Sequence, residues 1–137
     1  MNKQLHGRVA AIAFGTRVWV QERAFISNYN ADDLEGWCAI ASCELYKRLK
    51  ADGITAVIHM WVSEWGECHC FCVVEDYVVD ITATQFGEFY DQSVVIMPIL
   101  EAMEYEMYRG TEVFKCGKDL RRYQKRNRWP SQQVCFA

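Results

Sequence analysis

The sequence predicts an α+β fold in which a cysteine-bearing helix packs on an antiparallel β-sheet. In residues 36–53 apolar side chains recur at close to helical spacing, and Gly53 can end the helix. Beyond this helix the pattern changes to three strand-like runs at 54–62, 68–74 and 77–82, the first of which is rich in β-branched residues. Short turns separate these runs, so a helix followed by a meander of antiparallel strands is expected.

The remaining segments give weaker signals. Residues 8–20 are apolar and fit either a short helix or a strand, and the polar stretch 27–36 is typical of a loop. After an irregular segment at 82–92 we expect a strand at 94–97, a helix at 99–109 and a basic helix or tail at 117–128.

Length and composition indicate one globular domain over residues 1–137, with its core in 34–97. The chain is 51% hydrophobic and 24% charged, with five Trp, seven Tyr and seven Phe, which argues against disorder. Its net charge is −3, but seven of the 15 Lys and Arg residues lie in 115–128. The expected domain is therefore an acidic body with a basic C-terminal segment.

The cysteines and the apolar runs predict a cytoplasmic protein. Seven is an odd number, which excludes a fully paired disulfide framework, and Cys68, Cys70 and Cys72 alternate where mutual disulfides are awkward. No apolar run reaches the roughly 18–20 residues of a membrane span, and charged residues soon follow the apolar run after Val9. We expect neither a membrane nor a cofactor to be involved.

Cys38 lies at the first turn of the expected helix. Backbone N–H groups are unpaired at a helix start and the helix dipole is positive there, which lowers a thiol pKa and favours the reactive thiolate. The alternative is a small buried side chain, as free cysteines usually are. Cys43 points to a different helix face and is expected in the core.

A base and its orienting carboxylate are expected on two neighbouring strands. His69 shares one strand face with Phe71 and Val73, while the three thiols share the other. A two-residue turn at 74–75 or 75–76 puts Asp80 opposite or diagonal to His69, whereas a three-residue turn would direct it away. Within reach of each other, Asp80 would fix the His69 tautomer and His69 would act as base toward Cys38.

The order Gly36-Trp37-Cys38, then His69 to Val74, then Val78 to Thr82 resembles the transglutaminase-like branch of the papain-like cysteine superfamily. The stretch 80–86 looks like the continuation found in small papain-fold bacterial and phage proteins. The resemblance covers about residues 34–86. It implies a papain-like fold and acyl transfer from an amide of a protein or peptide through a thioester on Cys38, with water or an amine as acceptor. It also implies His69 as base and Asp80 as its orienting group.

The sequence departs from papain in lacking a glutamine shortly before the cysteine. An oxyanion would then be bound by the Cys38 backbone N–H and a second donor, for which Gln21, Asn28 and Asn30 are candidates. Trp37 and Trp65 are candidate substrate contacts. His59, on an apolar strand, could replace His69 only if its strand lay beside Cys38, and no matching carboxylate stands near it in sequence.

A zinc site is disfavoured although Cys68, Cys70 and Cys72 lie close to His69 and His59. The spacing is not that of a zinc knuckle, and alternate residues on a strand stand about 6.5 Å apart. We therefore expect no metal.

The second functional hypothesis is a non-catalytic binding protein on the same scaffold, such as an inhibitor. Its basic segment could bind nucleic acid or an acidic partner. The candidate cations are Lys118, Arg121, Arg122, Lys125, Arg126 and Arg128. The alternative is a solvated helix lying against the acidic body.

Overall fold

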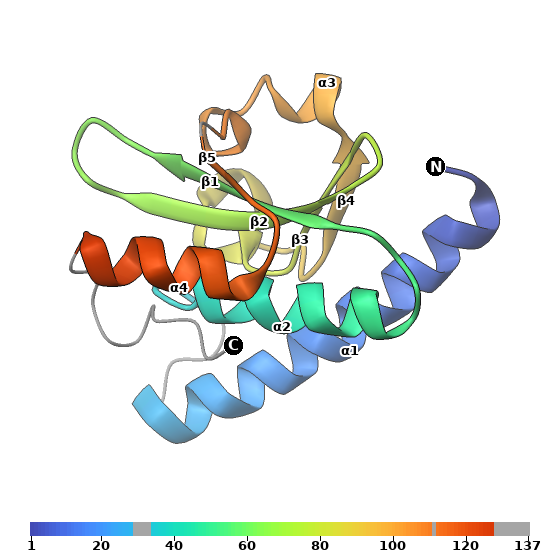
Figure 1. Cartoon of the computed structure of the whole chain (residues 1–137), viewed down its shortest axis with the longest axis horizontal. Helices are drawn as coiled ribbons and strands as arrows, with labels where there is room; N and C mark the ends of the chain where they lie inside the picture. Colours follow the sequence, from blue (N-terminus) through green and yellow to red (C-terminus); the bar gives the residue numbers. More distant parts are fainter. Residues whose placement is uncertain (29–33, 111, 128–137) are drawn as a thin grey trace.

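The computed structural model describes residues 1–28, 34–110 and 112–127 (Figure 1). Two helices, α1 (Lys3–Asn28) and α2 (Cys38–Ala51), precede the strands β1 (Val57–Val62), β2 (Cys68–Val74) and β3 (Tyr77–Asp80). Then come η1 (Ala83–Gln85), η2 (Gly87–Phe89), β4 (Val95–Pro98), α3 (Ile99–Ala102), η3 (Glu106–Tyr108), β5 (Glu112–Phe114) and α4 (Gly117–Arg126). The α+β class is confirmed.

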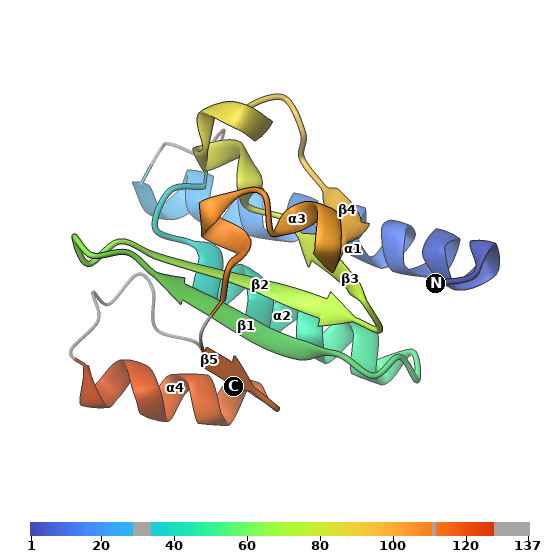
Figure 2. The same cartoon turned by 90° about the horizontal axis from the view of Figure 1, so that it is seen from above.

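The strands form one antiparallel sheet in the order β4-β3-β2-β1-β5. α1, α2 and α4 lie on one face, while α3 and the 3₁₀ segments lie on the other (Figures 1 and 2). Apolar side chains of β2 enter both layers: Cys70 and Cys72 join the core beneath the helices, and Phe71 and Val73 join the second core. The central strand is thus buried on both faces, and its two sets of side chains meet different parts of the chain.

The turn before α2 explains where that helix begins. Leu34 and Gly36 have positive φ angles of 56° and 84°. The Trp37 N–H donates to the Leu34 carbonyl at 3.1 Å, and the Ala41 N–H then donates to the Trp37 carbonyl at 2.9 Å. This tight turn reverses the chain and makes Cys38 the first residue of α2.

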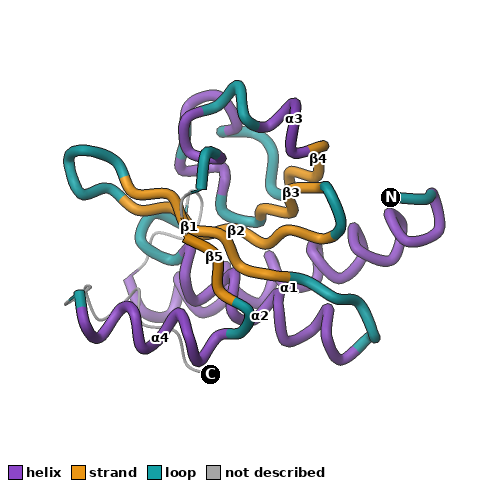
Figure 3. Tube along the Cα trace, turned by 45° about the horizontal axis from the view of Figure 1, so that its top comes forward, coloured by secondary structure: helices purple, strands orange, loops and turns teal. Residues whose placement is uncertain are grey.

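The structure decides one alternative that the sequence left open and differs from the expectations for other segments. Residues 8–20 lie inside one long helix, α1, which also includes residues 27 and 28 of the expected loop (Figure 3). The expected helix at 99–109 is divided into α3 and η3, because Tyr105 is extended and its ring packs on Phe89 at 4.9 Å. β5, which had no clear sequence signal, pairs with β1 at the sheet edge.

None of the helices in the described part of the chain is both long and apolar enough to cross a membrane.

Candidate active site

Cys38 lies at the start of α2, next to the beginning of β2. Its Sγ is 3.9 Å from the Cys68 carbonyl oxygen, and the residue is only 1% exposed. The first N–H groups of a helix have no intrahelical acceptor, so this end of α2 favours negative charge on the sulfur.

His69 and Asp80 meet as the two-residue turn requires. The turn consists of Glu75 and Asp76, because Val74 pairs with Tyr77, and Glu75 takes a left-handed φ of 52°. Asp80 is then diagonal to His69, and its Oδ2 lies 2.6 Å from His69 Nε2. Since Nε2 faces the carboxylate, Nδ1 is the ring nitrogen left to face a nucleophile.

Asp80 accepts hydrogen bonds from two further residues besides its contact with His69. Tyr108 donates its hydroxyl to Asp80 Oδ2 at 2.7 Å, and the Thr82 N–H donates to Oδ1 at 2.9 Å. The Thr82 bond also turns the chain, so the expected strand 77–82 ends at Asp80. Arg17, buried in α1, donates to the Ile81 carbonyl and to Thr84 Oγ1, both at 2.8 Å. α1 thereby fixes the segment that follows the carboxylate.

The three side chains form an electrostatically coupled set. A hydrogen bond from the Cys70 thiol, together with a hydrogen bond from His69 and its positive charge, lowers the pKa of Cys38 from 9.0 to about 5 although burial opposes this. Burial alone would lower the pKa of His69, but the charge and hydrogen bond of Asp80 raise it to about 10. Both shifts favour a thiolate and an imidazolium over a neutral pair at neutral pH.

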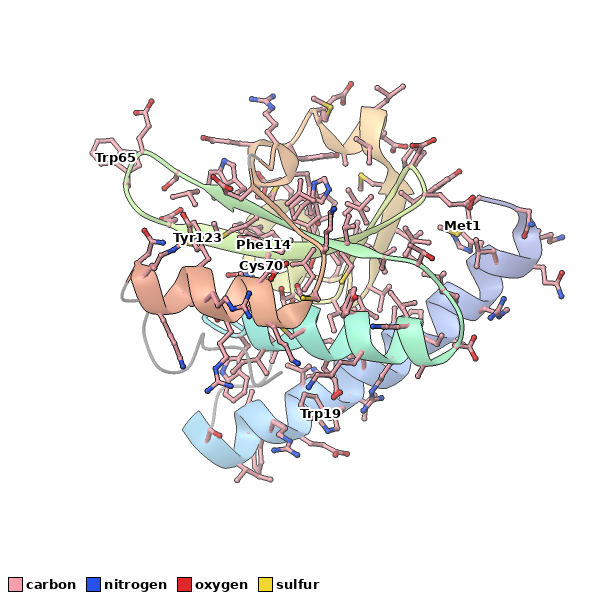
Figure 4. The ribbon with its side chains drawn as sticks, viewed as in Figure 1. Met1, Trp19, Trp65, Cys70, Phe114 and Tyr123 are labelled. Atoms are coloured by element: carbon pink, nitrogen blue, oxygen red, sulfur yellow. The ribbon has the colours of Figure 1, made fainter. Side chains whose placement is uncertain are left out.

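Cys70 is a member of the site for which the sequence indicated only a place in the core. Donation to the Cys38 sulfur and full burial raise its pKa well above 9.0, so it remains a protonated donor. Figure 4 shows Cys70 on β2, above the start of α2. The alternation of Cys68, Cys70 and Cys72 marked a shared strand face, and α2 packs on that face: Cys72 also donates to the Ser42 carbonyl on α2.

Gln85 and Tyr108 are further neighbours for which the sequence indicated no role. Gln85 Nε2 lies 3.3 Å from His69 Nδ1 and donates to the Thr82 carbonyl at 2.9 Å, which fixes the orientation of its amide. Gln85 belongs to the stretch 80–86 that carries part of the family resemblance, and this was the available signal. Tyr108 lies outside the region of resemblance, and nothing in its sequence context indicated it.

Gln21 is the one candidate oxyanion donor whose side chain belongs to the described part of the chain. Gln21 is half-buried on α1, and no hydrogen bond joins it to Cys38, His69 or Asp80 in the described part of the chain. The backbone of Asn28 ends α1, and its side chain lies outside the described part. Asn30 lies outside the described residues.

The two tryptophans differ in position. Trp37 is buried directly before Cys38, and its Nε1 has no hydrogen-bond partner among the described residues. Trp65 is 89% exposed at the tip of the β1–β2 hairpin (Figure 4). Trp37 is thus the nearer of the two to the thiol along the chain, and Trp65 is accessible to a large partner.

The rival residues lie apart from Cys38. His59 pairs with Phe71 across β1 and β2 and its ring packs on Phe71 at 5.6 Å, so it does not take the place of His69. Among the described residues no three His, Cys, Asp or Glu side chains are placed to hold a metal ion. Cys43 is buried on α2 and takes part in a disulfide bond, whereas the other described cysteines are not disulfide-bonded.

Comparisons of the chain with protein-family models, with curated proteins and with solved structures found no match.

Proposed function

We propose that this protein is a cysteine-dependent hydrolase or acyltransferase of the papain-like or transglutaminase-like kind, acting on an amide of a protein or peptide. The observation that carries the proposal is the buried set Cys38, His69 and Asp80, in which a lowered thiol pKa faces a raised imidazole pKa. A nucleophile, its base and an orienting carboxylate are the parts that thiol acyl transfer needs.

In the proposed reaction the Cys38 thiolate attacks the amide carbonyl carbon and forms a C–S bond. His69 gives its Nδ1 proton to the leaving nitrogen as the C–N bond breaks, which leaves an acyl thioester and a neutral imidazole. Water or an amine then attacks the thioester while His69 accepts its proton, and the departing sulfur restores the thiolate. Asp80, held by Tyr108, keeps Nε2 oriented throughout.

The oxyanion of this reaction would be bound by the Cys38 backbone N–H at the start of α2 and by a side-chain donor. We add Gln85 to the candidates Asn28 and Asn30 and prefer it to Gln21, because its amide nitrogen lies beside the ring nitrogen that faces the thiol. A modest shift of this amide toward a bound carbonyl would replace its hydrogen bond to the Thr82 carbonyl.

Selective alkylation tests the proposal without a known substrate. At pH 6 an ordinary thiol is almost fully protonated, so iodoacetamide should label Cys38 faster than the half-exposed Cys116, despite the burial of Cys38. Peptide mass spectrometry measures the labelling of each cysteine. His69→Ala should remove the advantage of Cys38, and labelling of Cys38 no faster than Cys116 in the parent protein would sink the enzyme proposal.

The alternative, a non-catalytic binding protein, is favoured by one observation, the exposed cations of α4. Lys118, Arg122, Lys125 and Arg126 are exposed, Arg121 is partly buried, and Arg128 lies outside the described residues. Binding to a generic DNA or RNA oligonucleotide that weakens steeply with salt, and is lost in Arg122→Glu/Lys125→Glu, would support this function. Unchanged binding in that double variant would argue against it.

A further inference from the structure

Helix α1 is apolar on two separate faces, and only one of them has a partner among the described residues. Val9, Ala13, Val20 and Ala24 are fully buried beneath the domain. On the other side Phe14 and Val18 are each 55% exposed and Phe25 is 61% exposed. Water-facing aromatic and branched side chains on one helix stripe mark an interaction surface.

The exposed stripe has the spacing of a coiled-coil seam. Its members are separated alternately by four and three residues along α1, so they return to the same helix face over about 27 Å. The seam consists of Gly7, Ala11, Phe14, Val18, Gln21 and Phe25. Gly7 and Ala11 are exposed like the larger members, and Gln21 is half-buried.

We propose that this seam is the interface of a homodimer, in which α1 of two copies packs antiparallel about a two-fold axis that passes between Phe14 and Val18. In this arrangement each layer of the seam pairs a larger side chain of one copy with a smaller one of the other copy. Phe25 of one copy lies over Gly7 of the other, Gln21 over Ala11, and Phe14 against Val18. A second copy therefore fits the stripe by size along its whole length.

Charge also fits a second copy. Arg8 and Glu22 lie on the same flank of the seam, near its opposite ends, so antiparallel pairing places Arg8 of each copy near Glu22 of the other. Arg8 already bonds Asp52 at 2.8 Å, but half of its side chain remains exposed and can meet a second carboxylate. A parallel dimer would instead place like charges together at both ends.

The described part of the molecule leaves the seam accessible. α1 lies at the outer edge of the helical layer, beside α2, and one of its sides is turned away from the sheet (Figures 1 and 2). Trp19 packs with Arg23 and Arg48 next to the seam rather than across it.

Sedimentation velocity on the full chain tests the dimer. The parent protein should show twice the mass of the 16.0 kDa chain, with dissociation on dilution. Phe14→Glu should raise the dimer Kd by at least about thirtyfold, since a central aromatic side chain is lost from both copies. Leu100→Glu, at a residue 87% exposed on α3, is the matched control and should leave the Kd unchanged. Circular dichroism verifies that both variants fold.

Cross-linking tests the orientation. In a background carrying Cys38→Ser, Cys68→Ser and Cys116→Ser, a short bis-maleimide should join two copies of Gly15→Cys, because residue 15 lies beside the proposed axis. It should not join two copies of Glu22→Cys, which stand about 18 Å apart along the helices. The proposal would be overturned by equal cross-linking at both positions or by a dimer whose Kd is unchanged in Phe14→Glu. It would also be overturned by a protein that is monomeric at every concentration, including a monomer that binds lipid vesicles through α1.

Discussion

Cys38 is the residue on which the proposed chemistry depends, and its ionisation can be measured directly. We predict that the parent protein gains thiolate ultraviolet absorbance with a midpoint near pH 5, and that Cys38→Ser lacks this transition. His69→Ala should move the midpoint upward, because the thiolate loses a hydrogen bond and a neighbouring positive charge. This measurement does not depend on reagent access to a buried sulfur, and a midpoint close to that of an ordinary thiol would contradict the ion pair.

Cys70 gives a second test at the residue scale. The hydrogen bond from its thiol is the largest of the effects that lower the Cys38 pKa, and Cys70 is fully buried on β2. Cys70→Ala should raise the Cys38 midpoint by about one to two units, the value of one hydrogen bond to a charged group. Cys70→Ser keeps a donor and should retain most of the lowering. Equal midpoints in the Ala and Ser variants would show that packing, not donation, is what Cys70 provides.

At the scale of the element, the turn before α2 determines where the helix begins and therefore where the Cys38 sulfur lies. Gly36 has a φ of 84°, which costs a residue with a Cβ about 1–2 kcal/mol. We predict that Gly36→Ala lowers the free energy of unfolding in urea by that amount and slows alkylation of Cys38. Gly87→Ala is the control, because Gly87 has an ordinary φ and leaves open space for the alanine methyl group. Equal losses of unfolding free energy in the two variants would show that the turn at Gly36 does not position Cys38.

Elements with a strong local pattern were predictable from the sequence. β2 occupies residues 68–74 as expected, because short turns bound an apolar run that includes Phe71, Val73 and Val74. The two-residue turn at Glu75 and Asp76 then fixes the register, so the meeting of His69 with Asp80 was predictable as well. Residues close together in the sequence thus determine both the strand β2 and the contact between His69 and Asp80.

Contacts between distant segments were not predictable in the same way. Tyr108 reaches Asp80 only because the chain breaks its helix at Tyr105 and turns inward, a result of packing against Phe89. Gln85 reaches His69 because a 3₁₀ turn follows Thr82. The position of Gln21 depends on how α1 packs as a whole, which no local pattern around that residue indicates.

At the scale of the whole molecule, the ion pair determines how stability depends on pH. The lowered pKa of Cys38 contributes stability that is present above about pH 9 and lost as pH falls through 5. The raised pKa of His69 contributes stability that is complete below 6.5 and lost as pH rises through about 10. Between 6.5 and 9 the folded pair and the unfolded pair each hold one proton, so their opposing slopes cancel.

We therefore predict that this pair contributes no pH dependence to the free energy of unfolding between pH 6.5 and 9.0. Between pH 6.5 and 5 the unfolded pair holds one proton more, and stability should fall by about 1.4 kcal/mol per pH unit. Cys38→Ser removes the pH dependence that Cys38 contributes and leaves that of His69. This variant should therefore lose stability as pH rises above 6.5, whereas the parent protein should not. Urea unfolding of both proteins across this range measures the difference, and parallel curves would mean that Cys38 and His69 form a neutral pair in the folded protein.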